Sequence, residues 1–198
     1  MTEKFIRSLE LKKTNLLGSS IGGWIAARIA IESSNLIDKL ILVDPIGFTD
    51  NYRFSDKIIG IYPIAKFMSQ TLLKPNRSNK NIERFIRSVF YNPKLPLLNE
   101  FIDYFYKTME TSHNLLFISR LSSSYGRKKL SLLNSLVKIK NNTLIIWGEK
   151  DKLMPLSKVE QNFKLIPKVE VRIIKDAGHI PSIEKSEEFN KIIVDFLD

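Results

Sequence analysis

The sequence predicts an α/β fold, in which a parallel sheet with flanking helices carries an inserted helical segment. Short, nearly continuous apolar runs typical of buried strands alternate with apolar stretches long enough for helices. Between residues 50 and 140 only helical spacing occurs. We therefore expect residues 1–49 and 141–198 to form one α/β core and residues 50–140 to form a helical insertion. A chain of 198 residues, 43% of them hydrophobic, can bury a substantial core of this kind.

Before the insertion, the elements alternate between helix and strand. The first helix is amphipathic, because Phe5, Ile6 and Leu9 fall on one side of it. Pro45 ends the second strand, since proline cannot donate to the ladder of a central strand. The predicted elements are a helix over residues 2–9, a strand that reads as buried over 14–18, a helix over 24–31 and a strand over 38–44.

The insertion is predicted to be helical throughout, and the α/β pattern resumes after it. In the insertion we predict helices over residues 57–69, 82–90, 98–109 and 113–121. After it we predict a strand over 143–148, a helix over 157–165, a strand over 169–174 and a helix over 186–197. Ser186, followed by Glu187 and Glu188, predicts an N-cap with acidic residues in the first turn of the last helix.

The net charge of +10 is concentrated in the insertion. Residues 50–140 hold 16 Lys and Arg against 6 Asp and Glu, whereas the two flanking parts together hold 15 of each sign. Such an excess fits a solvated surface, or a basic face that attracts anionic substrates, acidic partners or a membrane surface. No aromatic-interleaved basic motif and no zinc-ligand spacing accompanies it, so we expect no nucleic-acid partner. We expect no metal and no cofactor either.

Composition also predicts the compartment. No run of 18 or more apolar residues is present, so we expect no membrane span. The first seven residues carry charges where a secretory leader needs an apolar stretch. The chain has no cysteine, which excludes disulfides and thiolate chemistry. We expect a cytoplasmic protein.

The segment Gly18-Ser19-Ser20-Ile21-Gly22 joins a predicted strand directly to a predicted helix. A sharp turn at this place holds its central residue, Ser20, in a strained conformation that projects the hydroxyl above the sheet. Gly18 and Gly22 leave room for the crowded turn, and Gly23 lets the helix approach the strand. The amide of Ile21 and the positive end of the helix point toward an oxyanion. The alternative is a Gly/Ser turn that only caps a helix or holds a phosphate.

A serine nucleophile needs a base and a group that orients the base. Of the two histidines, His179 follows the last predicted strand, whereas His113 lies inside a helix of the insertion and is more typical of a structural residue. Asp151 follows the strand over 143–148, at the carboxyl edge where ligands of parallel sheets bind. Glu149 is the competing acid and reads as a solvated loop residue.

These motifs resemble, in order along the chain, those of the α/β-hydrolase fold family, and the whole chain resembles the C-terminal two-thirds of a member with a helical cap. The resemblance implies that Ser20 is the nucleophile, Asp151 the orienting acid, His179 the general base and the Ile21 amide an oxyanion donor. Residues 50–140 would be the cap that shapes the substrate pocket. The three motifs are Gly18-Ser19-Ser20-Ile21-Gly22-Gly23, Trp147-Gly148-Glu149-Lys150-Asp151 and Asp176-Ala177-Gly178-His179-Ile180-Pro181.

The resemblance implies a hydrolase of small molecules. Serine at position 20, in place of an aspartate nucleophile, argues against dehalogenases and epoxide hydrolases of this fold. It leaves esterases, lactonases, peptidases and carbon–carbon bond hydrolases, and we expect a carboxylic ester or related acyl substrate. Arg120 and the cluster Arg127-Lys128-Lys129 could meet a substrate carboxylate, or could be solvated surface.

The chain departs from the family before the nucleophile strand. Members of this fold have several earlier strands, and one of their loops supplies a second oxyanion amide, whereas 13 residues precede Thr14 here. The predicted strand over residues 14–18 would then be an exposed edge. We expect a shortened hydrolase, a chain that pairs with a separate N-terminal half, or a homodimer formed through this edge. A catalytically impaired relic or interaction module is therefore the alternative to an active enzyme.

Overall fold

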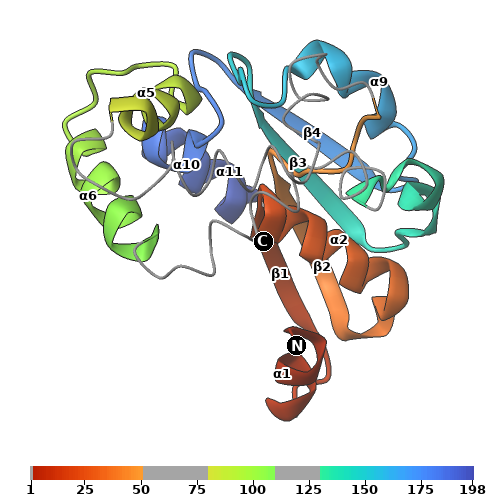
Figure 1. Ribbon diagram of the computed structural model, residues 1–198. Coiled ribbons are helices and arrows are strands. Elements are labelled where there is room, and N and C mark those ends of the chain that lie inside the picture. The colour runs from red at the N-terminus through yellow and green to blue at the C-terminus, as the bar shows by residue number, and fades with distance from the viewer. Residues whose placement is uncertain (1, 51–79, 110–129) are drawn as a thin grey trace, which may run out of the picture.

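The computed structural model describes residues 2–50, 80–109 and 130–198 of the chain. Within them, four parallel strands form one sheet in which sheet order and chain order coincide (Figure 1). The α/β prediction is confirmed. The strands are β1 (Thr14–Ser19), β2 (Ile37–Val43), β3 (Asn142–Gly148) and β4 (Val169–Ile174).

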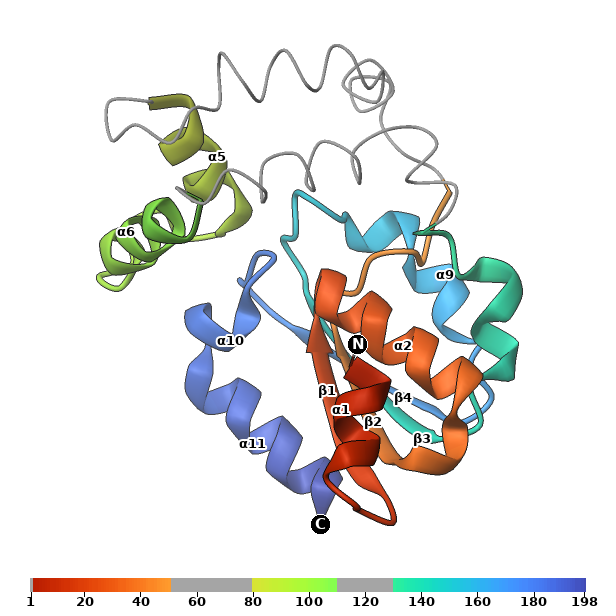
Figure 2. The ribbon, with the colours of Figure 1, turned by 60° about the horizontal axis from the view of Figure 1, so that its bottom comes forward.

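Helices cover both faces of the sheet. In Figure 2 the sheet lies between α2 on one side and α11 on the other. None of the described helices is long and apolar enough to cross a membrane. The α-helices are α1 (Thr2–Ser8), α2 (Ile21–Glu32), α5 (Lys80–Val89), α6 (Leu98–Met109), α9 (Glu160–Phe163), α10 (Pro181–Glu184) and α11 (Ser186–Leu197). Three short 3-10 helices are η1 (Ser34–Leu36), η2 (Leu133–Lys138) and η3 (Leu156–Lys158).

The last four residues of strand β2 show why the central strands carry continuous apolar runs. Successive side chains of a strand point to opposite faces of the sheet. Leu40 and Leu42 pack in the core under α2, whereas Ile41 and Val43 pack in the core under α11. All four side chains are at most 2% exposed. Two covered faces therefore require an apolar residue at each of these four successive positions, as the sequence indicates.

The two outer strands of the described sheet are much more exposed. Leu17 of β1 is 47% exposed and Ile173 of β4 is 37% exposed. The buried character that the residue pattern indicates for residues 14–18 is therefore wrong, whereas the exposed edge expected from the comparison with the family agrees with the described sheet. The physical reason is that β1 pairs with β2 on one side and with no described strand on the other.

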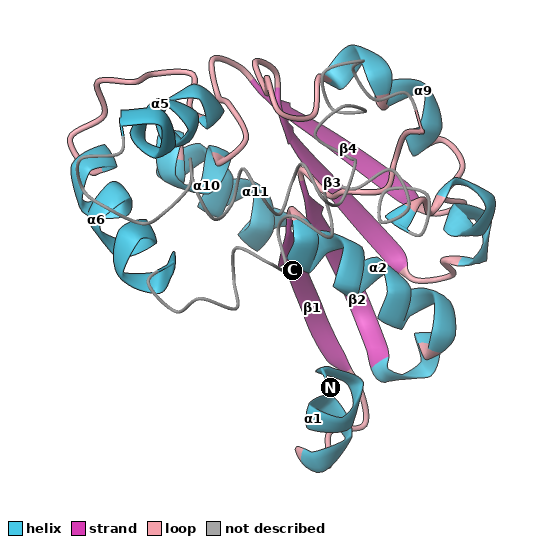
Figure 3. Cartoon of the chain, in the orientation of Figure 1, coloured by secondary structure: helices cyan, strands magenta, loops and turns pink. Residues whose placement is uncertain are grey.

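Helices α5 and α6 follow β2 and precede β3 in the chain, and they lie beside α10 (Figures 1 and 3). The predicted helices at 82–90 and 98–109 are confirmed, whereas those at 57–69 and 113–121 lie outside the described residues. Residues from Leu132 onward pack on the sheet again, with Leu132, Leu136 and Ile139 in the same core as α2. The helical pair forms its own small core from Ile86, Val89, Phe90, Leu98, Ile102 and Tyr106, on which Ile180 and Ile183 also pack.

Two details near the C-terminus correct the sequence prediction. The helix predicted at 157–165 is divided into η3 and α9, because Val159 leaves helical geometry with φ −123° and ψ −30°. The N-cap of α11 is Lys185, not Ser186, and it makes no side-chain capping bond. Proline at the start of α10 begins a separate short helix, and the chain turns at Lys185 before α11 begins at Ser186.

Candidate active site

Ser20 occupies the turn between β1 and α2 in a conformation that serine rarely adopts. Its φ is 53° and its ψ is −115°. Such geometry costs on the order of 1–3 kcal/mol and persists where surrounding contacts impose it. The amide of Ser20 donates to the carbonyl of Val43 at 2.8 Å, and its carbonyl accepts from the amides of Trp24 and Ile46, both at 3.2 Å. The hydroxyl does not cap α2 and is therefore available to another partner.

Crowding in this turn falls on Gly18. A Cβ atom there would lie 2.2 Å from the carbonyl oxygen of Gly22, and one on Gly23 would lie 2.8 Å from Cβ of Pro45. A Cβ atom on Gly22 would meet nothing within 4 Å, so the prediction that Gly22 makes room by lacking a side chain is wrong. It is the Gly22 backbone, not its Cα substituent, that faces the strand.

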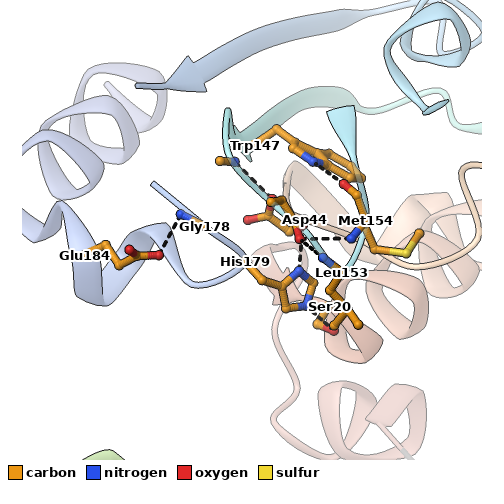
Figure 4. A network of polar contacts seen from close by, with 10 residues as sticks. Ser20, Asp44, Trp147, Leu153, Met154, Gly178, His179 and Glu184 are labelled. Carbon is orange, nitrogen blue, oxygen red and sulfur yellow. Dashed lines mark hydrogen bonds and ion pairs between the residues drawn. The ribbon is translucent and has the colours of Figure 1, made fainter. Parts of the chain in front are cut away.

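The structure brings Ser20, His179 and Asp151 into one hydrogen-bonded chain (Figure 4). Nε2 of His179 lies 3.0 Å from Oγ of Ser20, and Nδ1 lies 2.7 Å from Oδ2 of Asp151. The other carboxylate oxygen of Asp151 accepts from the amides of Leu153 and Met154 at 2.8 and 2.9 Å. His179 and Asp151 are 6% and 4% exposed. These contacts fix the carboxylate and leave one of its oxygens for the imidazole.

Ile21 is the residue whose amide is expected to bind an oxyanion. Ile21 is the first residue of α2 and directly follows Ser20. An amide at a helix N-terminus carries the positive end of the helix dipole and favours a developing negative charge. The described residues before β1 form α1, and Ser33 after the far end of α2 bonds Glu3 of that helix at 2.8 Å. Helix α1 therefore lies away from Ser20 and supplies no second donor.

The loop that carries His179 is held from both sides. A Cβ atom on Gly148, at the end of β3, would lie 1.9 Å from the carbonyl oxygen of Gly178, so only glycine permits this approach. On the other side, the amide of His179 donates to the carbonyl of Val89 in α5 at 2.8 Å. Oε1 of Glu184 accepts from the Gly178 amide at 2.6 Å, a bond that Figure 4 also shows. The loop of His179 thus rests on the sheet and on α5 together.

Sequence reasoning missed a fourth polar residue of this site, Asp44. Its side chain is 0% exposed, and its Oδ1 accepts from the Gly148 amide at 3.0 Å. Burial, and next the charge of Asp151, raise the pKa of the Asp44 carboxyl well above its usual range. Donor atoms of Asp44, Asp151 and His179 lie within 4.8 Å of one another, a spacing that could also hold a metal ion. The sequence did offer a signal for Asp44, because it is an acid that directly follows an apolar strand, at the same sheet edge as Asp151.

The remaining candidates contribute little to the described site. Glu149 lies at the surface, 37% exposed, with its Oε2 atom 3.3 Å from Nζ of Lys150, as expected for a solvated loop residue. Arg120, His113 and the Arg127-Lys128-Lys129 cluster lie outside the described residues.

A parallel α/β sheet with a serine, a histidine and an aspartate linked at its carboxyl edge defines a hydrolase-like protein. Residues 1–186 match the sequence model of the alpha/beta hydrolase fold family, and the chain belongs to this family. Its curated relatives include a 2-hydroxy-6-oxononadienedioate/2-hydroxy-6-oxononatrienedioate hydrolase of a Pseudomonas species, 25% identical over 191 residues. They also include the human monoacylglycerol lipase ABHD6, 27% identical over 205 residues.

These alignments cover 96% and 98% of this chain but 64% and 58% of the two relatives. The chain therefore spans about three-fifths of the length of these relatives. Among solved structures, 2-hydroxy-6-oxo-6-phenylhexa-2,4-dienoate hydrolase from Rhodococcus sp. strain RHA1 is similar with a TM-score of 0.76 and 18% identity. That likeness covers 97% of this chain and 66% of the Rhodococcus chain, and it shows the shared fold.

Proposed function

We propose that the protein is a serine hydrolase that cleaves a carboxylic ester or related acyl substrate through an acyl-enzyme. The observation that carries the proposal is the hydrogen-bonded chain from Ser20 through His179 to Asp151, at 3.0 and 2.7 Å. Serine hydrolysis requires a nucleophile within reach of a base whose other ring nitrogen is held by an acid. Neighbouring contacts hold all three groups, which is the preorganisation that this chemistry needs.

In the proposed reaction Nε2 of His179 takes the hydroxyl proton while Oγ of Ser20 bonds to the carbonyl carbon. The amide of Ile21 donates to the oxyanion that forms, and the imidazolium then gives its proton to the leaving alcohol. Water, deprotonated by His179, then attacks the acyl carbon. The acyl C–Oγ bond breaks, the imidazolium returns its proton to Oγ, and the acid leaves with Ser20 and His179 restored. Asp151 accepts from Nδ1–H throughout, which keeps the correct tautomer and stabilises the imidazolium. We also propose that residues 50–140 form a cap that shapes the pocket and that Arg120 meets a substrate carboxylate.

A fluorophosphonate probe tests the nucleophile directly, because it phosphonylates an activated serine without needing the natural substrate. We expect stoichiometric labelling at Ser20, loss of labelling in Ser20→Ala, and a large loss in His179→Gln. His113→Gln is the matched control and should label as the unaltered protein does. Folded protein that remains unlabelled would refute the proposal and favour an inactive interaction module.

A carbon–carbon bond hydrolase is the second candidate, favoured by the names of several relatives. A 2-hydroxy-6-oxo-6-phenylhexa-2,4-dienoate hydrolase of Comamonas testosteroni is 26% identical over 196 residues. The lipase relatives at 27% identity favour an ester instead. Turnover of 2-hydroxy-6-oxo-6-phenylhexa-2,4-dienoate, compared with a p-nitrophenyl ester under the same conditions, distinguishes the two candidates.

The exposed edge bears on how active the described chain is. Loss of one oxyanion donor lowers turnover by about 10²–10³-fold in well-studied serine hydrolases. We propose that pairing of β1 with a separate segment or a second copy raises the turnover of p-nitrophenyl esters, because β1 is an outer strand of the described sheet. Sedimentation of the purified chain shows whether two copies associate. Fast ester turnover by a monomer, abolished in Ser20→Ala, would show that β1 needs no further strand.

A further inference from the structure

Asp44 is a buried acid for which the reaction above has no use. It directly follows β2, with φ at 41°, in the left-handed region that aspartate occupies rarely. Its amide donates to the carbonyl of Ile146 at 3.0 Å, which continues the β2–β3 ladder. A completely buried carboxyl in a strained backbone conformation is costly, and such costs concentrate at functional sites.

The two oxygens of Asp44 have different surroundings. Oδ1 accepts from the amide of Gly148, so it acts as an acceptor. Oδ2 is buried and meets no hydrogen-bond donor within the described part of the protein. An unpaired buried oxygen of an ionised carboxylate would be strongly unfavourable. A proton on Oδ2 turns that atom into a donor, which can use an acceptor nearby.

The groups that face Asp44 make an ionised state still less favourable. Asp151 and His179 each place a polar side-chain atom within 4.8 Å of a carboxyl oxygen of Asp44. Besides burial, the negative charge of Asp151, and a hydrogen bond to its carboxylate, both raise the pKa of Asp44. Glu184 adds a further negative charge at longer range. Among the described residues, the charged groups that shift its pKa are thus both acids, and burial acts in the same direction.

We propose that Asp44 is a neutral carboxylic acid that donates a hydrogen bond from Oδ2 to the Asp151 carboxylate and thereby positions the acid that orients His179. Asp44 is a positioning residue, since it acts through Asp151. Asp44 and Asp151 together then carry one negative charge, which is on Asp151. The imidazole of His179 therefore lies beside a single charge. The inference rests on the proposed roles of Ser20, His179 and Asp151 and adds to them the protonation state of a fourth residue.

The test is the titration of His179 by NMR, which requires no catalytic activity. The chain contains two histidines, so ¹⁵N-histidine-labelled, untagged protein carrying His113→Gln reports His179 alone. Its imidazole pKa is compared in this background and after adding Asp44→Asn or Asp151→Asn. An asparagine at position 44 can still accept from Gly148 and donate to Asp151, and it has the charge of the neutral acid.

We expect Asp44→Asn to change the His179 pKa by less than about 0.5 unit and Asp151→Asn to lower it by about 1–3 units, the effect of removing a nearby negative charge. A fall of about one unit or more in Asp44→Asn would overturn the proposal, because it would show that Asp44 carries a charge. Both results are informative even if the serine is unreactive, so failure of the proposed function is distinguishable from failure of this inference.

The rate of fluorophosphonate labelling tests the positioning role. We expect Asp44→Asn to label within about threefold of the unaltered protein and Asp44→Ala to label at least about tenfold more slowly, because only asparagine retains a donor toward Asp151. Equal labelling rates in folded Asp44→Ala and Asp44→Asn would refute the positioning role. If Asp44→Ala fails to fold, the titration of Asp44→Asn still decides the charge state.

Discussion

The backbone amide of His179 donates a hydrogen bond of 2.8 Å to the carbonyl oxygen of Val89, so the loop of the proposed base is attached to the last turn of α5. Glu184 strengthens the same junction. Its Oε1 accepts from the Gly178 amide at 2.6 Å, and its Oε2 accepts from the amides of Tyr91 and Asn92 at 2.8 and 3.1 Å. One carboxylate therefore joins the histidine loop to the segment that follows α5.

Glu184→Ala should loosen this junction. Hydrogen bonds to a charged acceptor contribute about 1.5–3 kcal/mol each, less where water reaches them, so we expect the free energy of unfolding to fall by about 2–4 kcal/mol. Because the loop positions His179, labelling of Ser20 by a fluorophosphonate should also slow. Urea unfolding and labelling rates measure the two effects.

Glu187→Ala is the matched control, since Glu187 is exposed on α11. An exposed substitution away from such contacts changes the free energy of unfolding by about 0.5 kcal/mol or less. Equal losses in Glu184→Ala and Glu187→Ala would show that the junction contributes no specific stability.

Asp151→Asn should leave the fold intact and remove most of the reactivity of Ser20. The amide cannot accept from both the imidazole and the Leu153 and Met154 amides as the carboxylate does, so it favours the wrong tautomer of His179. The comparable change in a serine protease lowers kcat by about 10⁴-fold. We expect a loss of about 10³–10⁴-fold in the labelling rate. Glu149→Gln, in the same loop, should label normally, and a similar loss there would move the orienting role to Glu149.

The raised pKa of Asp44 makes stability depend on pH with a definite sign. The carboxyl holds its proton more tightly in the folded chain than in the unfolded chain, where its pKa is about 3.9. Its stabilising contribution is therefore present below that value and is lost as the pH rises through the raised folded-state pKa. The Asp44→Asn variant has no titrating group at this position, so it does not lose stability in this way as the pH rises.

Urea unfolding of both proteins across a pH range measures the effect. From about pH 4 upward, the free energy of unfolding of the unaltered protein should fall relative to Asp44→Asn, by at most about 1.4 kcal/mol per pH unit. The difference between the two curves cancels groups that titrate alike in both. Parallel curves would contradict the raised pKa.

Two glycines of the turn that carries Ser20 should respond oppositely to alanine. The Gly18→Ala methyl group would meet the Gly22 carbonyl oxygen, a backbone atom, so the turn must shift; we expect a loss of about 2–3 kcal/mol and much slower labelling. Gly22→Ala places its methyl group in open space within α2, where alanine stabilises a helix by up to about 1 kcal/mol relative to glycine. Calorimetry of the two variants compares them, and equal losses would contradict the geometry of this turn.

The sequence predicts an element well where its apolar spacing is set by packing against a single buried face. Helix α6 has the predicted bounds because Leu98 and Ile102 recur at helical spacing on its buried side. Ser20, Asp151 and His179 could be predicted to meet because the carboxyl ends of parallel strands share one edge of a sheet. That the three residues meet therefore follows from their positions, each directly after a predicted strand of one parallel sheet.

Other features depend on contacts that have no sequence signature. The carbonyl of Val89 that holds His179 is a backbone atom, so no residue type reveals it. Asp44 could be predicted only as a residue after a strand, because its protonation depends on burial and on Asp151, 107 positions later in the chain. The apolar residues of β1 read alike for a central strand and an edge strand, so its exposed edge was expected from the comparison with the family and not from the residue pattern.

The pairing of β2 with β3 has a consequence for when the protein becomes reactive. Ser20 comes from the part of the chain before the insertion, whereas Asp151 and His179 come from the part after it, and about 100 residues separate the two strands that join them. Contacts this distant in sequence form slowly during folding. In the proposed mechanism, a nascent or partly folded chain therefore carries an ordinary, inert serine. The hydroxyl would become reactive only when the two parts close, and by then the surrounding structure determines what can reach it.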